Sequence, residues 1–141
     1  MLPSTRYAAP VYFFLTCAGV FFASTPFLFA ATDVSDTFIT VDTVWNLSGS
    51  PYVILDGADV EVAEEVELFI EPGVVVKFGD GADLDIYGIL RAEGSALKEI
   101  YFTSIFDDEA GGDTNGDGGA TLPTEFDDWG INFRPGSTGT F

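Results

Sequence analysis

Histidine is absent from this chain of 141 residues. Catalytic Ser-His-Asp and Cys-His arrangements, and metal sites built on histidine, are therefore excluded. The single cysteine, Cys17, lies in an apolar run near the N-terminus, where it serves as one more apolar residue. If that run is removed, no cysteine remains for a disulfide, a thiolate metal site or a cysteine nucleophile.

Basic residues are scarce as well. Five lysines and arginines stand against 23 aspartates and glutamates, which gives a formal net charge of −18. Arg6 is the one charged residue among the first 30, so the rest of the chain is more acidic still. A surface of this kind repels nucleic acid and anionic lipid, and we exclude both as partners. It favours solubility in salty surroundings and the binding of cations.

The N-terminal run, VYFFLTCAGVFFASTPFLFA, is long enough to span a bilayer. Its helix-breaking Pro26, the small residues Ala30 and Ala31, and the abrupt change to ATDVSD are more typical of a secretory signal. We predict a signal peptide over residues 1–31, cleaved after Ala30 or Ala31, with an uncleaved anchor as the alternative. The expected location is secreted or at the cell surface, without membrane association after cleavage.

Residues 60–104 alternate apolar and polar side chains in very short runs, each interrupted by glycine, proline or acidic residues. This pattern predicts short strands with one buried face. The inward pairs are expected to be Val60/Val62, Leu68/Ile70, Val76/Phe78, Leu84/Ile86, Leu90/Ala92 and Ile100/Phe102. Outward positions are expected to be Glu61, Phe69, Lys77, Asp85, Arg91 and Tyr101.

The inward pairs repeat, because every third pair is separated by 22 or 24 positions. A period in the low twenties made of three strands indicates an all-β fold of the parallel β-solenoid type, in which each coil is buried against its neighbours. An antiparallel sandwich also gives strands at short intervals and is the alternative. Stacking should place the strands that end near Phe78 and Phe102 parallel to each other.

We predict three regions: the signal peptide, a capping segment over residues 32–50 with Trp45 over the core, and coils over residues 51–141. Between Phe102 and the next inward pair, Ile131/Phe133, about two dozen glycine-rich and acidic residues are inserted. Their low apolar content predicts a long surface loop. Loops of this length are usually functional or disordered.

The stretches LFIEPGVVVKF, LDIYGILRAEG, IYFTS and DDEAGGDTNGDGGATLPTEFDDWGINF resemble the N-terminal coils of secreted bacterial right-handed parallel β-helix proteins of the pectin-lyase-like group. The resemblance covers roughly residues 51–133. It implies a right-handed parallel β-helix on an extracellular protein. Many proteins of this group have no known catalysis, so the resemblance implies a fold and a location more than an activity.

Only about two and a third coils can be counted before Phe141, whereas solenoids need about three or more for a stable stack. We therefore expect the coils to continue beyond the chain end. A chain that ended here would be expected to self-associate end to end through its unpaired strand edges.

The loop Asp113-Thr114-Asn115-Gly116-Asp117-Gly118 matches the first half of a D-x-[DN]-x-[DN]-G calcium loop. A complete EF-hand is not expected, because position 12 is Thr124 and no helical pattern flanks the loop. We predict a Ca²⁺ site in which carboxylates at both ends of the insertion complete the ligand set. The candidate ligands are Asp113, Asn115, Asp117, Asp107, Asp108, Asp127 and Asp128. An unliganded flexible turn is the alternative.

Two functions follow from these observations. The first is a noncatalytic structural or adhesion module, secreted or on the cell surface, whose loop is stabilised by Ca²⁺ and whose partner is an extracellular carbohydrate or surface molecule. The alternative is the N-terminal part of a polysaccharide lyase or glycoside hydrolase. The resemblance implies Ca²⁺ and a basic residue for a lyase, and Arg91, Lys98 and Arg134 match no lyase motif. The sequence does not identify a catalytic residue.

Overall fold

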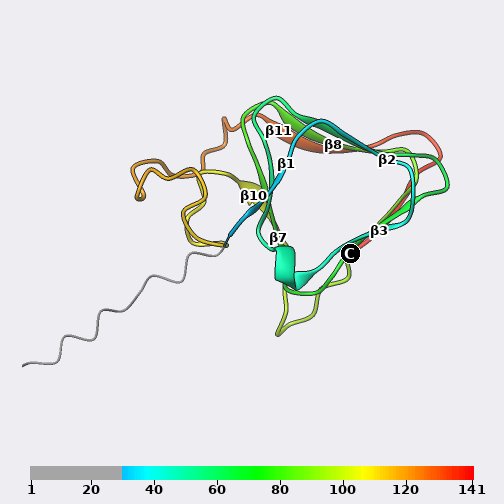
Figure 1. The fold of residues 1–141 in the computed structure, drawn as a ribbon, viewed down its shortest axis with the longest axis horizontal. Coiled ribbons are helices and arrows are strands. Elements are labelled where there is room, and N and C mark those ends of the chain that lie inside the picture. Colours follow the sequence, from blue (N-terminus) through cyan, green and yellow to red (C-terminus); the bar gives the residue numbers. More distant parts are fainter. Residues whose placement is uncertain (1–29) are drawn as a thin grey trace, which may run out of the picture.

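The computed structural model describes residues 30–141, so almost all of the predicted signal peptide lies outside the described residues. These residues form twelve short strands and one 3₁₀ turn, with no α-helix among them. The strands wind around a common axis and give a triangular cross-section with one parallel sheet on each side (Figure 1). The expected fold class, an all-β parallel solenoid with a long acidic insertion, is confirmed. In the described part of the chain, no helix has the length and apolar character needed to cross a membrane.

Every third strand belongs to the same sheet. Sheet A contains β1 (Thr32–Val34), β4 (Tyr52–Ile54), β7 (Val75–Phe78) and β10 (Tyr101–Ser104). Sheet B contains β2 (Thr37–Ile39), β5 (Asp59–Val62), β8 (Ala82–Ile86) and β11 (Trp129–Phe133). Sheet C contains β3 (Thr43–Trp45), β6 (Glu67–Ile70), β9 (Ile89–Arg91) and β12 (Thr138–Thr140). The 3₁₀ turn η1 (Leu47–Gly49) connects β3 to sheet A.

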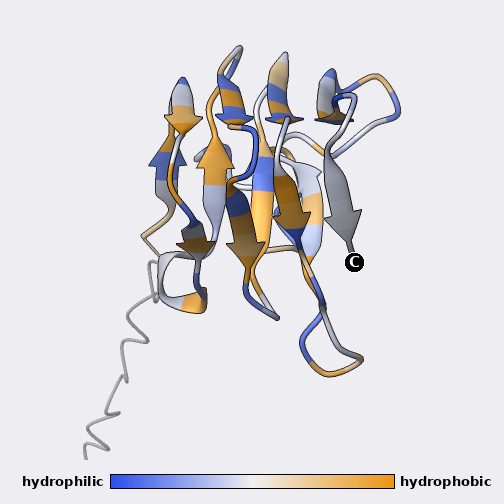
Figure 2. Cartoon of the chain, turned by 90° about the vertical axis from the view of Figure 1, so that its right-hand side faces the viewer, coloured by the Kyte–Doolittle hydropathy of each residue, from blue (hydrophilic) through white to orange (hydrophobic). Residues whose placement is uncertain are grey.

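The core is a column of aliphatic and aromatic side chains inside the triangle, and Figure 2 shows the stacked strands with their alternating hydropathy. The expected inward pairs from Val60 to Ala92 are all buried, and Ile100 and Phe102 pack partly buried against them. In β5 and β8, Val62 lies opposite Ile86 in parallel register. Burial of one face of every strand against the coils above and below therefore holds the stack together.

Residues 32–50, which we expected to cap the solenoid, form a coil of their own. Strands β1, β2 and β3 pair in parallel with β4, β5 and β6. Trp45 is buried and its ring stacks on Tyr52 at 4.8 Å between centroids. The count of two and a third coils was too low, because β1 to β10 already makes about three turns.

The parallel pairing of the strands that contain Phe78 and Phe102 is confirmed, but their register differs from the expectation. Phe102 lies opposite Val76, and Ser104 lies opposite Phe78. The corner before β10 is longer than the two earlier corners that lead from sheet C to sheet A, and it contains a tight turn that bridges Ser95 and Lys98. These additional residues shift β10 by two positions, and the ring that stacks on Phe78 is Trp129, at 4.6 Å.

Acidic side chains at the corners connect successive coils. The carboxylates of Asp36, Asp42 and Asp56 accept hydrogen bonds from the backbone amides of Asp59, Glu67 and Asp80, respectively. Each bond spans one coil and satisfies an amide that the sheet ladders leave free. Part of the acidic excess is therefore used inside the fold rather than for a ligand.

Candidate cation site

The acidic insertion, residues 105–128, leaves sheet A after β10 and enters sheet B at β11. In Figure 1 it is the yellow and orange segment that projects beside sheet A. Its first part covers the outer face of that sheet, because a Cβ added to Gly111 would lie 3.2 Å from Pro51 and 3.3 Å from Val75. Gly111 has φ of +76°, so glycine suits this close approach in both space and conformation. Val53 of β4, which is 2% exposed, is buried on this side.

Lys77 of β7 fastens the insertion to sheet A. Its Nζ donates to the carbonyl oxygens of Asp107 at 2.7 Å and Gly112 at 2.5 Å. The side chain points outward from the sheet, as expected, but it is fully buried rather than solvated. Burial lowers the pKa of Lys77, and the nearby carboxylates of Asp108, Asp107 and Asp113 oppose that shift. The ammonium is thus an internal cation beneath an acidic loop.

Above this anchor, three carboxylates converge. Asp108, Asp113 and Asp117 each offer an oxygen, and these atoms lie within 4.8 Å of one another. Ligand oxygens on opposite sides of one Ca²⁺ are separated by about 5 Å, since each bond is about 2.4 Å long. The three aspartates, here called the Asp cluster, are therefore close enough to hold a single metal ion.

Asp108 is the member of the Asp cluster that lacks hydrogen bonds. Its Oδ1 is buried and has no hydrogen-bond partner, and the hydroxyl of Thr114 is in the same condition. Burial raises the pKa of Asp108, and the charges of Asp113 and Asp117 raise it further. A cation beside these carboxylates would reverse this effect by favouring the ionised form.

Asp113 and Asp117 are held by the loop backbone. Asp113 accepts from the amides of Gly116, Asp117 and Gly118. Asp117 accepts from the amides of Gly119, Ala120 and Thr121. The chain wraps around each carboxylate because glycines at 116, 118 and 119 adopt positive φ. Both carboxylates are thereby positioned before any ion binds.

Asp117 gives the loop a pH dependence. The hydroxyl of Thr121, together with the amides of Ala120, Gly119 and Thr121, lowers the pKa of Asp117 from 3.8 to about 2. A carboxylate whose pKa is lower in the folded state stabilises that state above its ordinary pKa, and this contribution is lost as pH falls through the folded value.

We therefore expect the turn at residues 117–121 to lose its order as the pH falls from 3.8 to about 2. NMR amide shifts of Gly119 and Ala120 should report this change. In Asp117→Asn, the same amides should show no such titration. Shifts that titrate unchanged in the variant would contradict the assignment to Asp117.

The other predicted ligands lie outside the Asp cluster. Asp107 accepts from the hydroxyl of Thr103 and the amides of Glu109 and Ala110. Asp127 accepts from the amide and hydroxyl of Thr124, and the carbonyl of Asp128 accepts from Gly81. Asn115 donates from Nδ2 to Asp117 at 3.0 Å. Asp107 and Asp127 thus form local turns at the two ends of the insertion.

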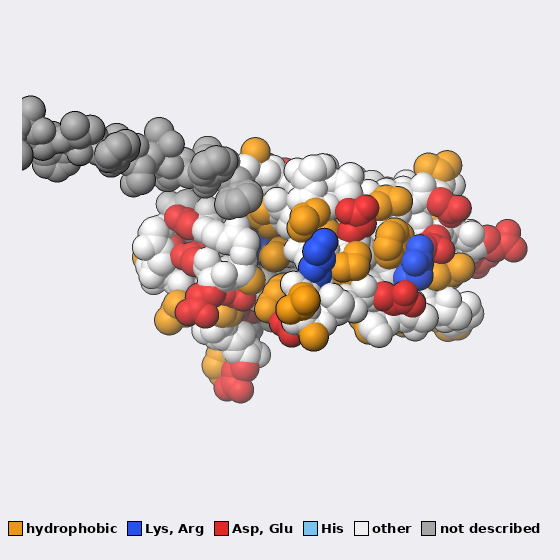
Figure 3. All heavy atoms as spheres, turned by 90° about the horizontal axis from the view of Figure 1, so that it is seen from below, with side chains coloured by type: hydrophobic (Ala, Val, Ile, Leu, Met, Phe, Trp, Pro, Cys, Tyr) orange, Lys and Arg blue, Asp and Glu red, His pale blue; other side chains and the backbone are white. Residues whose placement is uncertain are grey.

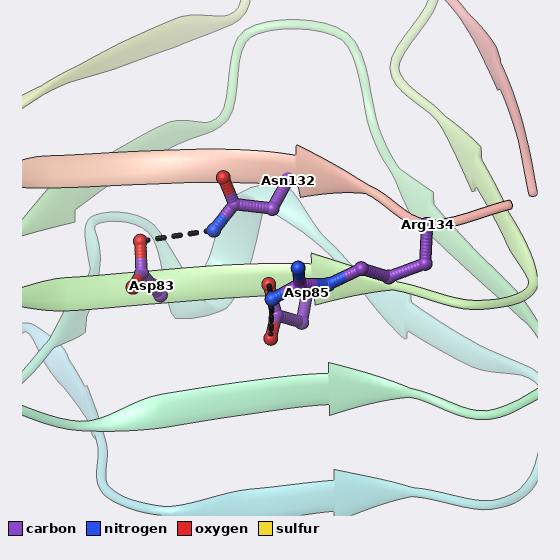
Figure 4. Close-up of polar contacts among 4 residues, drawn as sticks. All are labelled: Asp83, Asp85, Asn132 and Arg134. Carbon is purple, nitrogen blue, oxygen red and sulfur yellow. Dashed lines mark hydrogen bonds and ion pairs between the residues drawn. The ribbon is translucent and has the colours of Figure 1, made fainter.

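A second polar group lies on the outer face of sheet B, and Figure 4 shows it across β8 and β11. Asn132 donates to Asp83 at 3.1 Å, and Nη2 of Arg134 donates to both carboxylate oxygens of Asp85 at 2.8 and 2.7 Å. These bonds join residues 49 positions apart. They fix the register of β11 after the insertion, so Arg134 has a structural use.

Arg91 is also paired. It donates to Glu67 at 2.8 Å and its guanidinium lies 3.8 Å from the centre of the Phe69 ring. The face shown in Figure 3 likewise has basic side chains beside acidic and hydrophobic ones. In the observed arrangement each arginine is paired with one carboxylate of the neighbouring coil, Arg91 with Glu67 and Arg134 with Asp85.

The sequence does not mark Lys77 as a site residue. Lys77 alternates with the inward residues Val76 and Phe78, as a solvent-exposed strand residue does. No local pattern indicates that a loop distant in the sequence covers it.

Comparison with known proteins gives a distant and partial match. No protein-family model matches the chain, and no solved structure matches it. Protein bark beetle of Drosophila melanogaster is 33% identical over 107 residues. The aligned part is 74% of this chain but 3% of that protein, so the chain spans a very small share of its relative's length.

Proposed function

We propose that this chain is a noncatalytic structural module of an extracellular protein, in which the Asp cluster binds Ca²⁺ and orders the acidic insertion on sheet A. The convergence of three carboxylates within 4.8 Å is the observation that carries the proposal. Without a cation, their mutual repulsion opposes the closed loop.

Calcium suits this site better than the other common metals. The donors are carboxylate oxygens, with the hydroxyl of Thr114 and the side chain of Asn115 in the same loop, and hard oxygen donors favour Ca²⁺ or Mg²⁺. The chain has no histidine for transition metals. Mg²⁺ demands a near-ideal octahedron, whereas Ca²⁺ accepts irregular geometry from a flexible glycine-rich loop.

The acidic insertion also requires a bound cation for its order, because its own apolar side chains are exposed and do not stabilise it. Leu122 is 73% exposed and Phe126 is 84% exposed. Fixing a loop backbone costs about 1–2 kcal/mol per residue, and little burial offsets that cost here. A bound cation supplies the missing free energy.

The extracellular location rests on the sequence of residues 1–31 and on the acidic surface, which repels nucleic acid and anionic lipid. The partner in that setting is an extracellular carbohydrate or surface molecule. A noncatalytic role is supported by Arg91 and Arg134, both of which are engaged in ion pairs between coils.

Thermal unfolding tests the cation site. We expect millimolar Ca²⁺ to raise the Tm, and Asp113→Ala with Asp117→Ala to abolish the shift. At a concentration one hundred times the Kd, binding adds about 2.7 kcal/mol to the free energy of unfolding. For a domain of this size, that corresponds to a rise of roughly 10 °C.

The matched control is Glu109→Ala with Glu125→Ala, which removes two charges from the same insertion outside the Asp cluster. This variant should keep the full Ca²⁺ shift. A calcium titration of the unmutated protein with neither heat nor a thermal shift would refute the proposal.

A further inference from the structure

The loop of residues 113–118, here called the cation loop, contains an asparagine that is followed by a glycine. The chain has three asparagines, and only Asn115 precedes a glycine. When the backbone nitrogen after an asparagine attacks the side-chain Cγ, a five-membered succinimide forms and ammonia leaves. A side chain on the following residue obstructs this approach, whereas glycine presents none.

The structure favours this attack at Gly116. Its φ is +75°, and the space around the position of a Cβ is open. Its N–H donates to Oδ1 of Asp113 at 2.7 Å, so a carboxylate contacts the proton that must leave the attacking nitrogen.

The other two asparagines lack one or more of these features. Asn132 lies in the ladder of β11 and precedes Phe133. Asn46 precedes Leu47, whose N–H also donates to a carboxylate, that of Glu71 at 3.1 Å. Asn46 therefore shares the carboxylate next to the attacking N–H, but a leucine side chain follows it and its Oδ1 accepts from the amides of Ser48 and Gly49, so it serves as an internal control.

We propose that Asn115 is a deamidation site that alters the cation loop. The nitrogen of Gly116 loses its proton and bonds to Cγ of Asn115, and the bond from Cγ to Nδ2 breaks to release ammonia. Water then opens the succinimide at one of its two carbonyls. One opening gives aspartate at position 115, and the other gives isoaspartate, with the main chain passing through the former side chain.

The two products have opposite effects on the site, an inference that rests on the proposed Ca²⁺ binding. Aspartate adds a carboxylate at the third position of the loop, and Ca²⁺ affinity rises with ligand charge. Isoaspartate inserts one carbon into the main chain between Asp113 and Asp117. It displaces the amides of Gly116 and Gly118 from Asp113, and the prepared loop is lost.

Ageing of the full chain tests the modification without requiring a cation. The protein is incubated at mildly alkaline pH with a chelator, and peptides are analysed by mass spectrometry with an isoaspartate-specific methyltransferase. We expect Asn115 to convert many-fold faster than Asn46 or Asn132, and Gly116→Ala to suppress conversion. Equal or absent conversion at Asn115 would overturn the proposal, whatever calcium does.

Two further measurements test the link to the cation. We expect millimolar Ca²⁺ to slow conversion several-fold, because an ion on Asp113 removes the proton acceptor of Gly116. We also expect Asn115→Asp, which reproduces the first product, to bind Ca²⁺ several-fold more tightly. If Ca²⁺ binds but changes neither conversion nor the affinity of this variant, the link is refuted while the cation site stands.

Discussion

Replacing Phe78 with alanine is expected to cost about 3–5 kcal/mol in the free energy of unfolding. Phe78 is fully buried at the end of β7, where it pairs with Ile54 of β4 and stacks on the ring of Trp129. Removing its ring leaves a cavity between three successive coils. Each coil is buried only by its neighbours, so the loss at one coil weakens the contacts on both sides.

Urea unfolding followed by tryptophan fluorescence measures this cost. If Phe78→Ala does not fold, Phe78→Leu provides a smaller change of the same kind, expected to cost about 1 kcal/mol. The control is Phe38→Ala on the outside of sheet B, where Phe38 is 60% exposed, with an expected change within about 0.5 kcal/mol. Equal costs for the two phenylalanines would contradict the placement of the core.

Strand positions and the inward face were predictable because both depend on local alternation. Val62 and Ile86 repeat one coil apart and lie opposite each other, as the 24-residue spacing predicts. The register of Phe102 was not predictable, because the tight turn at Ser95 and Lys98 lengthens the corner before β10. The average spacing of the inward pairs does not account for these additional residues. A corner can change length without altering the alternation on either side.

Part of the candidate site was also predictable. Asp113 and Asp117 belong to a local motif, and the same turn brings them together. Asp108 joins them through a long-range contact, because Lys77 of β7 fixes the neighbouring carbonyl of Asp107. Asp107 and Asp127 are acidic residues of the same insertion, but they accept hydrogen bonds in local turns at its two ends, and their carboxylates are not among the three that converge. Residue type alone does not distinguish these cases.

Replacing Lys77 with methionine is expected to release the insertion from sheet A. The change keeps the apolar stem but leaves the carbonyls of Asp107 and Gly112 without their donor. A buried carbonyl without a partner costs about 1–3 kcal/mol. Exposing the loop to water costs less free energy than keeping both carbonyls buried without a donor. We therefore expect local detachment of the insertion rather than global unfolding.

Hydrogen exchange measures this detachment. The amides of Glu109 and Ala110, which donate to Asp107, should exchange faster in Lys77→Met, while those of β5 and β8 keep their protection.

The pH dependence of the free energy of unfolding should change as well. Between the lowered pKa of Lys77 and 10.5, the unfolded chain binds more protons, so the stability of the unmutated protein rises with pH there. The variant should lack this rise.

Lys98→Met provides the matched control, since Lys98 is exposed and lies in the corner before β10. It removes the same charge from an acidic protein without touching the insertion, so its exchange pattern should match that of the unmutated protein. If Lys77→Met and Lys98→Met gave the same pattern, general electrostatics would account for the effect. Faster exchange confined to the insertion in Lys77→Met would show that the direct contact matters, because the Lys77 ammonium joins sheet A to the carbonyls of Asp107 and Gly112 and Lys98 does not.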